Sequence, residues 1–366
     1  MRAAVDSLRL PAIDISNRVM TDTVTLTIDT TGTGDQGANE SRTNRLAAAG
    51  AGVSGRTDQG GSSRGIGGGP AATPAAVSLQ YAWPANLDAT VRARFARSGT
   101  RSTLPDGVDA TYQLRTTPND YGSRVEVRSR ELLAVPTHTL EDEDRWERAR
   151  VLVSLFPAVL VDHDGRVAGL AEPDDYLDTV RTAFLERWGG GTKDADEEAT
   201  AYLDANLSPQ LAILSAERYW NPLVAFWAGA KMEVGQRETV ELARALQFPG
   251  AASPVEVRVP VTYGLDGWVK CQPDASEPAC VKLVSSYEIR EFDVRQPLAT
   301  AGPDGRPVRV EKHLDRTRTV LIADPDTLLP YHYYEERIID SVSGGAADRH
   351  VMKRRERMEL TFSYRR

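Results

Sequence analysis

The sequence predicts an α+β protein built on a curved, mainly antiparallel β-sheet, open like half a barrel, with a central helical insert packed against it. Three observations predict this class. Apolar residues alternate with a period of two from Val77, a helical period replaces it over about 139–230, and long alternating runs return after about 235. Single strands do not alternate with single helices, which disfavours a parallel doubly wound sheet. We therefore predict one folded domain over 77–366.

The first 76 residues differ in composition from the rest. All 25 Phe, Trp and Tyr residues lie from Tyr81 onward, and residues 31–70 include 12 glycines. Such a segment buries too little apolar surface to offset the chain entropy that it would lose on ordering. We predict that 1–76 is disordered, with 31–76 a flexible linker. Residues 24–28 alternate like a strand, but no strand-like neighbour lies near them in the sequence.

The strands are predicted from alternation that buries one face of a sheet and leaves the other in water. In the first half of the domain, alternating runs occur at 77–83, 91–95, 112–114 and 125–127, with turn residues at 119–122. In the second half, they occur at 255–261, 281–292, 308–323, 328–339 and 350–364. The last run sets Met358, Leu360 and Phe362 on one side against Arg355 and Arg357 on the other.

Five helices are predicted in the insert. They begin near 139, 173, 195, 208 and 221. Thr139 precedes a capping-box-like start, Pro173 occupies a favoured first-turn position, and Ser208 opens the fourth helix as an N-cap. Pro157 ends the first helix, and the fifth is short. A hairpin over 159–167 separates the first helix from the second.

The charge of the chain is unevenly distributed. The formal net charge is −8, and residues 137–207 hold 17 acidic against 7 basic side chains. An acidic balance argues against a general nucleic-acid binder, which shows a basic surplus. No run approaches the roughly 18 apolar residues of a membrane-spanning helix, so no transmembrane segment is predicted.

Three short motifs resemble functional sites but lack the context that those sites need. A G-x-G-x-x-G match at 32–37 lies in the Gly-rich linker, outside any βαβ unit. The run 320–328, apolar residues followed by acidic ones, resembles the nucleophile strand of haloacid-dehalogenase-type phosphatases, but it is one residue short, so we predict a turn between strands. The Asp162-x-Asp164-Gly165 run lacks the later ligands of a calcium loop and predicts a hairpin turn. No catalytic residue, metal site or cofactor is identified.

Cys271 and Cys280 are the only cysteines, and a polar turn of eight residues separates them. This arrangement predicts a disulfide and hence an oxidising, extracytoplasmic compartment, the periplasm or the exterior. A metal site would need further ligands, and a redox pair usually has C-x-x-C spacing. The N-terminus shows no signal peptide, so either the protein is not exported or this sequence omits the signal.

Aromatic residues concentrate in the helical insert and in one strand. A helical stripe at 176–188, the residues at 220–227 and the run 331–334 supply more aromatic bulk than short helices need. Core packing explains such residues, and so does the lining of an apolar ligand pocket. The candidate ligand-binding residues are Phe184, Trp188, Trp220, Phe226, Trp227, Tyr331 and Tyr333.

The order of elements over 77–366 resembles that of bacterial extracytoplasmic half-barrel proteins, the Lol-type lipoprotein carriers and the mycobacterial lipid carriers. The resemblance implies a curved sheet and helices that enclose an apolar ligand cavity. It rests on element order, so it transfers no residue roles. We therefore expect a non-enzymatic envelope protein that binds an apolar small molecule, a lipid or a partner chain. The alternatives are a hydrolase with catalytic groups on several strands and a structural protein of a surface assembly.

Overall fold

The structure is a computed structural model of the 366-residue chain. It describes residues 24–26, 76–99, 107–133, 157–188, 207–246, 255–302, 305–344 and 349–364, with a few single residues between 197 and 251. The predicted helix at 139–156, most of the one near 195 and nearly all of the predicted disordered segment 1–76 lie outside the described residues. The division at residue 76 therefore stays a prediction.

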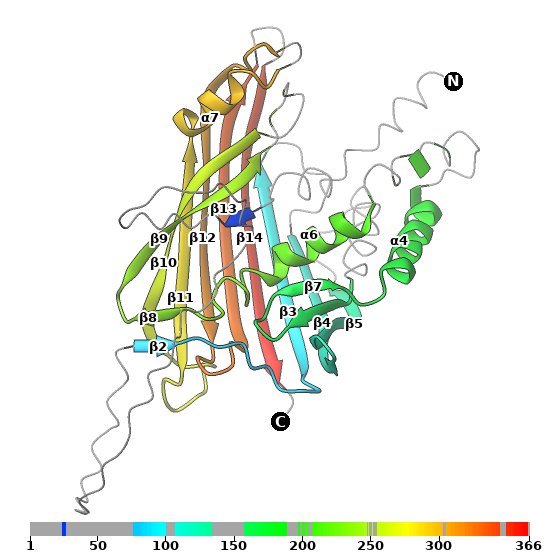
Figure 1. Ribbon diagram of the computed structural model, residues 1–366, viewed down its shortest axis with the longest axis vertical. Coiled ribbons are helices and arrows are strands. Elements are labelled where there is room, and N and C mark those ends of the chain that lie inside the picture. The colour runs from blue at the N-terminus through cyan, green and yellow to red at the C-terminus, as the bar shows by residue number, and fades with distance from the viewer. Residues whose placement is uncertain are drawn as a thin grey trace, which may run out of the picture.

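A single antiparallel sheet of twelve strands dominates the fold, in the order β1-β9-β10-β11-β12-β13-β14-β3-β4-β5-β6-β7. Its first half comprises β3 (Asp88–Gly99), β4 (Gly107–Asn119), β5 (Gly122–Leu133), β6 (Val159–Asp162) and β7 (Val167–Leu170). Its second half comprises β9 (Arg237–Leu246), β10 (Val255–Val269), β11 (Cys280–Arg290), β12 (Val310–Ala323), β13 (Pro330–Ser343) and β14 (His350–Tyr364). The sheet curves and stays open (Figure 1), which confirms the predicted fold class.

Two short pairings involve the N-terminal part of the chain. β1 (Val24–Leu26) lies antiparallel to β9 at the edge of the sheet, which gives the strand-like run at 24–28 a partner far along the sequence. β2 (Ala76–Ser78) pairs with β8 (Lys231–Glu233) in a separate two-stranded sheet.

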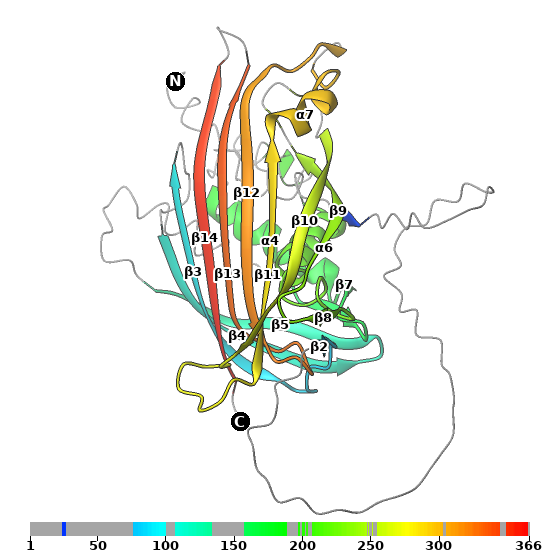
Figure 2. The same ribbon diagram turned by 90° about the vertical axis from the view of Figure 1, so that its left-hand side faces the viewer.

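The described residues form three helices, α4 (Pro173–Trp188), α6 (Pro209–Trp220) and α7 (Glu291–Leu298). The first two begin within one residue of the predicted starts. α6 lies in the hollow of the sheet and packs on β7, while α7 lies at the far end of the strands (Figure 1). We call the face of the sheet toward α6 the inner face and the opposite face the outer face; Figure 2 looks onto the outer face, with α4 and α6 behind the strands.

The predicted fifth helix is wrong, because residues 221–229 form consecutive turns. Pro222 has no N–H to donate. The backbone N–H groups that follow bond irregularly, three residues back from Leu223 to Trp220 (3.0 Å), four from Val224 to Trp220 (3.0 Å) and five from Phe226 to Asn221 (2.9 Å), so no regular helical ladder forms. The segment ends at Gly229, whose φ of 81° lies in the left-handed region that glycine adopts without strain. These turns fold Trp227 back against α6 and the sheet.

The helix α7 falls where the alternation predicted the end of a strand. β11 stops at Arg290, whose backbone N–H donates to the Asp293 carboxylate at 2.7 Å and so caps the helix. Val294 and Leu298 of α7 are buried against the inner-face valines of β10 and against Ile289. The segment that begins with Ile289 was predicted as strand, because four residues are too few to distinguish the period of two of a strand from the period of 3.6 of a helix.

Candidate functional site: the inner face of the half-barrel

Cross-strand register arranges the inner face of β11–β14 in rows that cross the sheet. The row nearest α6 is apolar and consists of Leu283, Leu321, Tyr333 and Leu360. Each of these residues is at most 8% exposed, and all belong to one core cluster with α6. This row forms the apolar end of the inner face.

An aromatic base lies beneath the apolar row, at the α6 end of the hollow. Trp83 and Trp220 pack edge to face with ring centroids 5.0 Å apart, and Phe226 and Trp227 do so at 4.8 Å. Both Trp220 and Trp227 are buried, and their indole N–H groups donate to the carbonyls of Gly165 (2.7 Å) and Pro222 (2.8 Å). A Cβ at Gly165 would lie 2.9 Å from the Tyr81 ring, so the close approach of the Gly165 backbone to Tyr81 requires glycine.

The structure therefore places four of the predicted ligand-binding residues at this end. Trp220, Phe226, Trp227 and Tyr333 belong to the core cluster or pack on it. Tyr331 lies elsewhere, with its ring 5.3 Å from that of Tyr364. The side chains of Phe184 and Trp188 lie outside those that the structure describes. The satisfied indoles favour a core role for the tryptophans, and their contact with a ligand stays a prediction.

The next row is amphipathic and only half-buried. It consists of Ser285, Thr319, Glu335, Met358 and Phe95. Although they face inward, Ser285, Glu335 and Met358 keep part of their surface accessible. The Tyr333 hydroxyl donates to the Glu335 carboxylate at 2.6 Å, and burial raises the pKa of Tyr333 well above its usual value. This row marks the border between apolar and charged surface.

Two further rows, toward α7, carry charged groups in the interior. Arg337 donates two hydrogen bonds to the Asp315 carboxylate at 3.0 and 2.7 Å, and the side chains are 10% and 2% exposed. On the neighbouring strand Arg354 pairs with Glu356 at 2.6 Å, with 15% and 7% exposed. Arg244 of β9 lies over the Tyr287 ring, 4.0 Å from its centroid, and donates to its hydroxyl.

His313 continues the polar surface beyond Asp315. Its Nδ1 lies 3.2 Å from the Ser341 hydroxyl, and the Phe248 ring packs against the imidazole edge to face. Burial lowers the pKa of His313 although Asp315 and the acidic residues at the start of α7 act in the opposite direction. Among the described residues, no group hydrogen-bonds its Nε2.

The inner charges were missed by sequence reasoning, although the signal was present. Asp315 and Arg337 occupy the same alternation phase as Leu321 and Tyr333, so the period of two already put them inside. A charged residue at an inward position of a long strand is uncommon in a plain core. A search for charged residues in the inward alternation phase of the long strands would have found the ionic rows.

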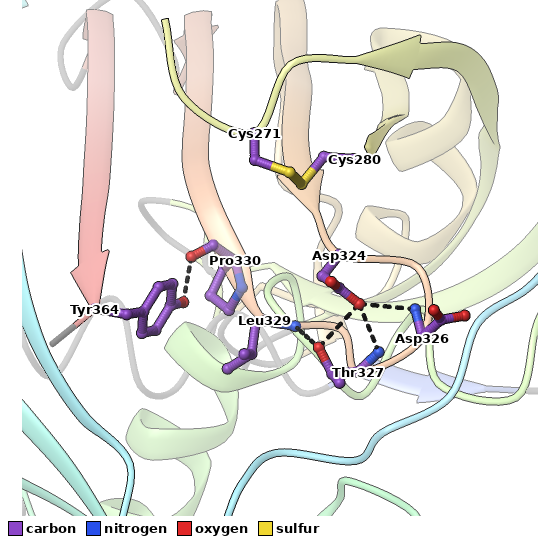
Figure 3. The surroundings of a disulfide bond; sticks show 8 residues. All are labelled: Cys271, Cys280, Asp324, Asp326, Thr327, Leu329, Pro330 and Tyr364. Carbon is purple, nitrogen blue, oxygen red and sulfur yellow. Dashed lines mark hydrogen bonds between the residues drawn. A yellow bond between two sulfur atoms is a disulfide. The ribbon is translucent and has the colours of Figure 1, made fainter. Parts of the chain in front are cut away.

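The disulfide between Cys271 and Cys280 is present as predicted, with a Cα–Cα distance of 5.0 Å. It closes the β10–β11 connection beside the β12–β13 turn (Figure 3). In that turn the Asp324 carboxylate accepts hydrogen bonds from the backbone of Asp326 (2.9 Å) and from the backbone and side chain of Thr327 (3.0 and 3.1 Å). The acidic end of the phosphatase-like run is therefore a turn, as predicted.

The motif at 162–165 is also a turn. The Asp162 carboxylate accepts backbone hydrogen bonds from Asp164 (3.0 Å) and Arg166 (2.8 Å) within the β6–β7 hairpin. A small cavity of about 220 Å³ opens beside this hairpin and is lined by Tyr81, Ala82, Trp83, Ala85, Pro118, Gly122, Ser123 and His163. Within the described ranges, His, Cys, Asp and Glu do not gather in groups of three as metal ligands, and no helix is long and apolar enough to cross a membrane.

Comparisons with known proteins add little. No protein-family model matches the chain, and neither does any curated protein. Among solved structures, it is similar to lipovitellin in a study of that protein's lipid–protein interactions, with 12% identity and a TM-score of 0.35. The match covers 77% of this chain and 25% of lipovitellin, so the chain spans about a quarter of that protein's length. A likeness at this score carries no argument about fold or function.

Proposed function

We propose that the protein is a binding protein that holds an amphiphilic ligand, with an apolar body and a polar end, against the inner face of its half-barrel. The observation that carries this proposal is the change along the inner face from an apolar row to buried ion pairs. A buried charge is costly unless it is paired, and such groups gather at functional sites more often than in plain cores. The half-exposed row between the two surfaces supports an accessible space there.

The rows suggest how such a ligand would lie. Its apolar body would contact Met358 and Phe95, the partly exposed apolar residues of the half-exposed row, where burial of apolar surface stabilises binding by about 25 cal/mol per Å². Its polar end would meet Glu335 and the ionic rows. Because Arg337 and Arg354 are already held by carboxylates, their positions are fixed before the ligand arrives, which reduces the ordering cost of binding.

The disulfide supports an oxidising compartment as the place of action. An extracytoplasmic half-barrel that binds apolar molecules matches the expectation drawn from lipid and lipoprotein carriers. The relation to those families remains part of the proposal, supported by the architecture alone.

Two adjacent serines of β11 provide a matched test. Ser285 faces the inner space, whereas Ser286 is exposed on the outer face. Ser285→Trp should fill the space over the half-exposed row and abolish binding of a fluorescent fatty-acid analogue. Ser286→Trp should bind the analogue as the wild type does. Met358→Trp, from β14, provides a second inward block. Urea unfolding of all variants confirms that each is folded before binding is compared.

Two results would overturn the proposal. One is a wild-type protein that neither binds the analogue nor yields co-purified lipid by mass spectrometry of material isolated from its own host. The other is unchanged binding by folded Ser285→Trp and Met358→Trp.

A partner chain is a second candidate, favoured by one observation. β1 covers only Leu242, Ala243 and Arg244 of β9, so this edge of the sheet accepts an added strand. Residues 237–241 of β9 pair on their other side with β10 and have no strand at the edge among the described residues. A peptide bound there would extend β1, and amide hydrogen exchange on 237–241 would detect it as added protection.

A further inference from the structure

The outer face of the sheet carries an excess of basic residues over the four adjacent strands β12, β13, β14 and β3 taken together. Three of these strands, β3, β12 and β14, supply the outward basic residues, which are Arg92, Arg94, Lys312, Arg316, Arg318, Lys353, Arg355 and Arg357. The outward acidic residues at paired positions of the same strands are Asp88, Glu336, Asp340 and Glu359. We call this surface the basic face. Its eight basic side chains exceed its four acidic ones.

The acidic groups on and beside the basic face are shared among several cations. One oxygen of Glu336 accepts hydrogen bonds from Arg355 (2.9 and 2.6 Å) and from Arg357 (2.9 Å). Asp109 of β4 is in turn shared by Arg92 and Arg94, at 3.2 and 3.3 Å. Positive charge is therefore left over even where ion pairs form.

Two arginines on the basic face are exposed and make no ion pair with any described residue. Arg316 and Arg318 occupy successive outward positions of β12. Arg318 lies opposite Glu336 in the register, but that carboxylate is already engaged by β14. Both guanidinium groups are available to an anion from outside.

The location of the acidic excess makes this basic surface notable. The chain carries a net charge of −8, and residues 137–207 alone contribute 17 acidic against 7 basic side chains. None of those residues belongs to the four strands of the basic face. The charge is thus separated, and a local basic surface attracts anions over about a Debye length, 8 Å at physiological salt.

The composition of the basic face indicates what kind of anion fits. Apolar side chains that are partly exposed lie between the arginines, among them Val320, Ile322 and Tyr334. The basic residues come from β3, β12 and β14 and do not converge on one point; Figure 2 shows these strands side by side on the outer face, with β13 between β12 and β14. Such a surface suits many phosphate groups side by side, because each guanidinium offers a fork that matches phosphate oxygens.

We propose that the basic face docks the protein on a lipid surface that carries anionic phosphate headgroups. Basic residues near such a surface each strengthen binding severalfold, and the interspersed apolar groups contact the interface. This proposal does not depend on a ligand in the half-barrel. The rival partner, an acidic protein, is an outcome of the test.

Co-sedimentation with lipid vesicles tests the docking. The full chain should sediment with vesicles of phosphatidylglycerol and phosphatidylcholine, and not with vesicles of phosphatidylcholine alone. Added salt should release it. Arg316→Glu with Arg318→Glu should weaken the partitioning by more than about tenfold, because two cations become anions at the contact. Both residues are exposed and unpaired among the described residues, so the double variant should keep its fold.

A control with the same charge change uses exposed arginines outside the basic face. Arg295→Glu with Arg306→Glu, on and after α7, should sediment like the wild type. Equal binding of the two double variants, or equal binding to both kinds of vesicle, would overturn the proposal. So would the absence of vesicle binding together with salt-sensitive binding to soluble polyglutamate, which would assign the face to an acidic protein. The fatty-acid assay on the same preparations reports separately on the inner face.

Discussion

The pair formed by Asp315 and Arg337 should be sensitive to the loss of one partner and tolerant of the loss of both. The Asp315 side chain is 2% exposed and the Arg337 side chain 10%, and two hydrogen bonds of 3.0 and 2.7 Å join them. Arg337→Met leaves a buried carboxylate without its cation, which typically costs about 3–5 kcal/mol of folding stability. The double variant Asp315→Leu, Arg337→Met removes both charges and should cost far less, since buried pairs replaced by apolar residues are often neutral.

Urea unfolding followed by circular dichroism measures these differences as a double-mutant cycle. The control is the exposed pair of Glu336 and Arg355, on the outer face of the neighbouring strands, with side chains 22% and 48% exposed. Arg355→Met should change stability by less than about 1 kcal/mol. If Arg337→Met and Arg355→Met cost the same, or if the double variant is no more stable than Arg337→Met, the inner pair is not desolvated as the structure indicates.

Three further results are expected. Trp227→Ala should lower the free energy of unfolding by about 3–5 kcal/mol in urea titration, because it removes a side chain that is 1% exposed and hydrogen-bonded to Pro222; a loss below about 1 kcal/mol would contradict its core role. Burial lowers the native-state pKa of His313, so its contribution to the free energy of unfolding should be fully present above about pH 6.5, the pKa in the unfolded chain. That contribution should be lost as the pH falls through the native-state pKa. Unfolding measured across this pH range should show a smaller pH dependence for His313→Gln than for the wild type. The native protein should show no reactive thiol by labelling, and replacing Cys271 and Cys280 by Ser should cost at most about 2–3 kcal/mol because the closed loop is short; two free thiols in protein from its own host would refute the bridge there.

Period-two alternation was sufficient to predict the strands of the second half and the class of the fold. The run over 350–364 is β14, and its apolar side at Met358, Leu360 and Phe362 faces the core as expected. Such strands are predictable because one face meets water and the other does not, so apolar and polar residues alternate in the sequence. Alternation does not reveal the order of the strands in the sheet, since β14 pairs with β3 across more than half of the chain.

The candidate site was predicted less well, for two physical reasons. Aromatic bulk indicated Trp220 and Trp227, but bulk alone does not distinguish a pocket from a core; the distinction lies in where the indole N–H groups donate. The ionic rows require knowing which charged residues stand opposite one another, as Arg337 and Asp315 nearly do on adjacent strands. That knowledge comes from register, a long-range property of the fold.

The junction between β14 and β3 has a consequence for how the chain acquires its structure. The sheet consists of two contiguous parts, β3–β7 and β9–β14, and in the order of strands β14 alone joins them. Figure 1 shows this junction as the meeting of a red strand with a cyan one. Because β14 is synthesised last of all these strands, β3–β7 must wait, with one edge of β3 unpaired, until β14 has been made. Pairing over so long a sequence separation is slow, so this protein should rely on a chaperone during that interval.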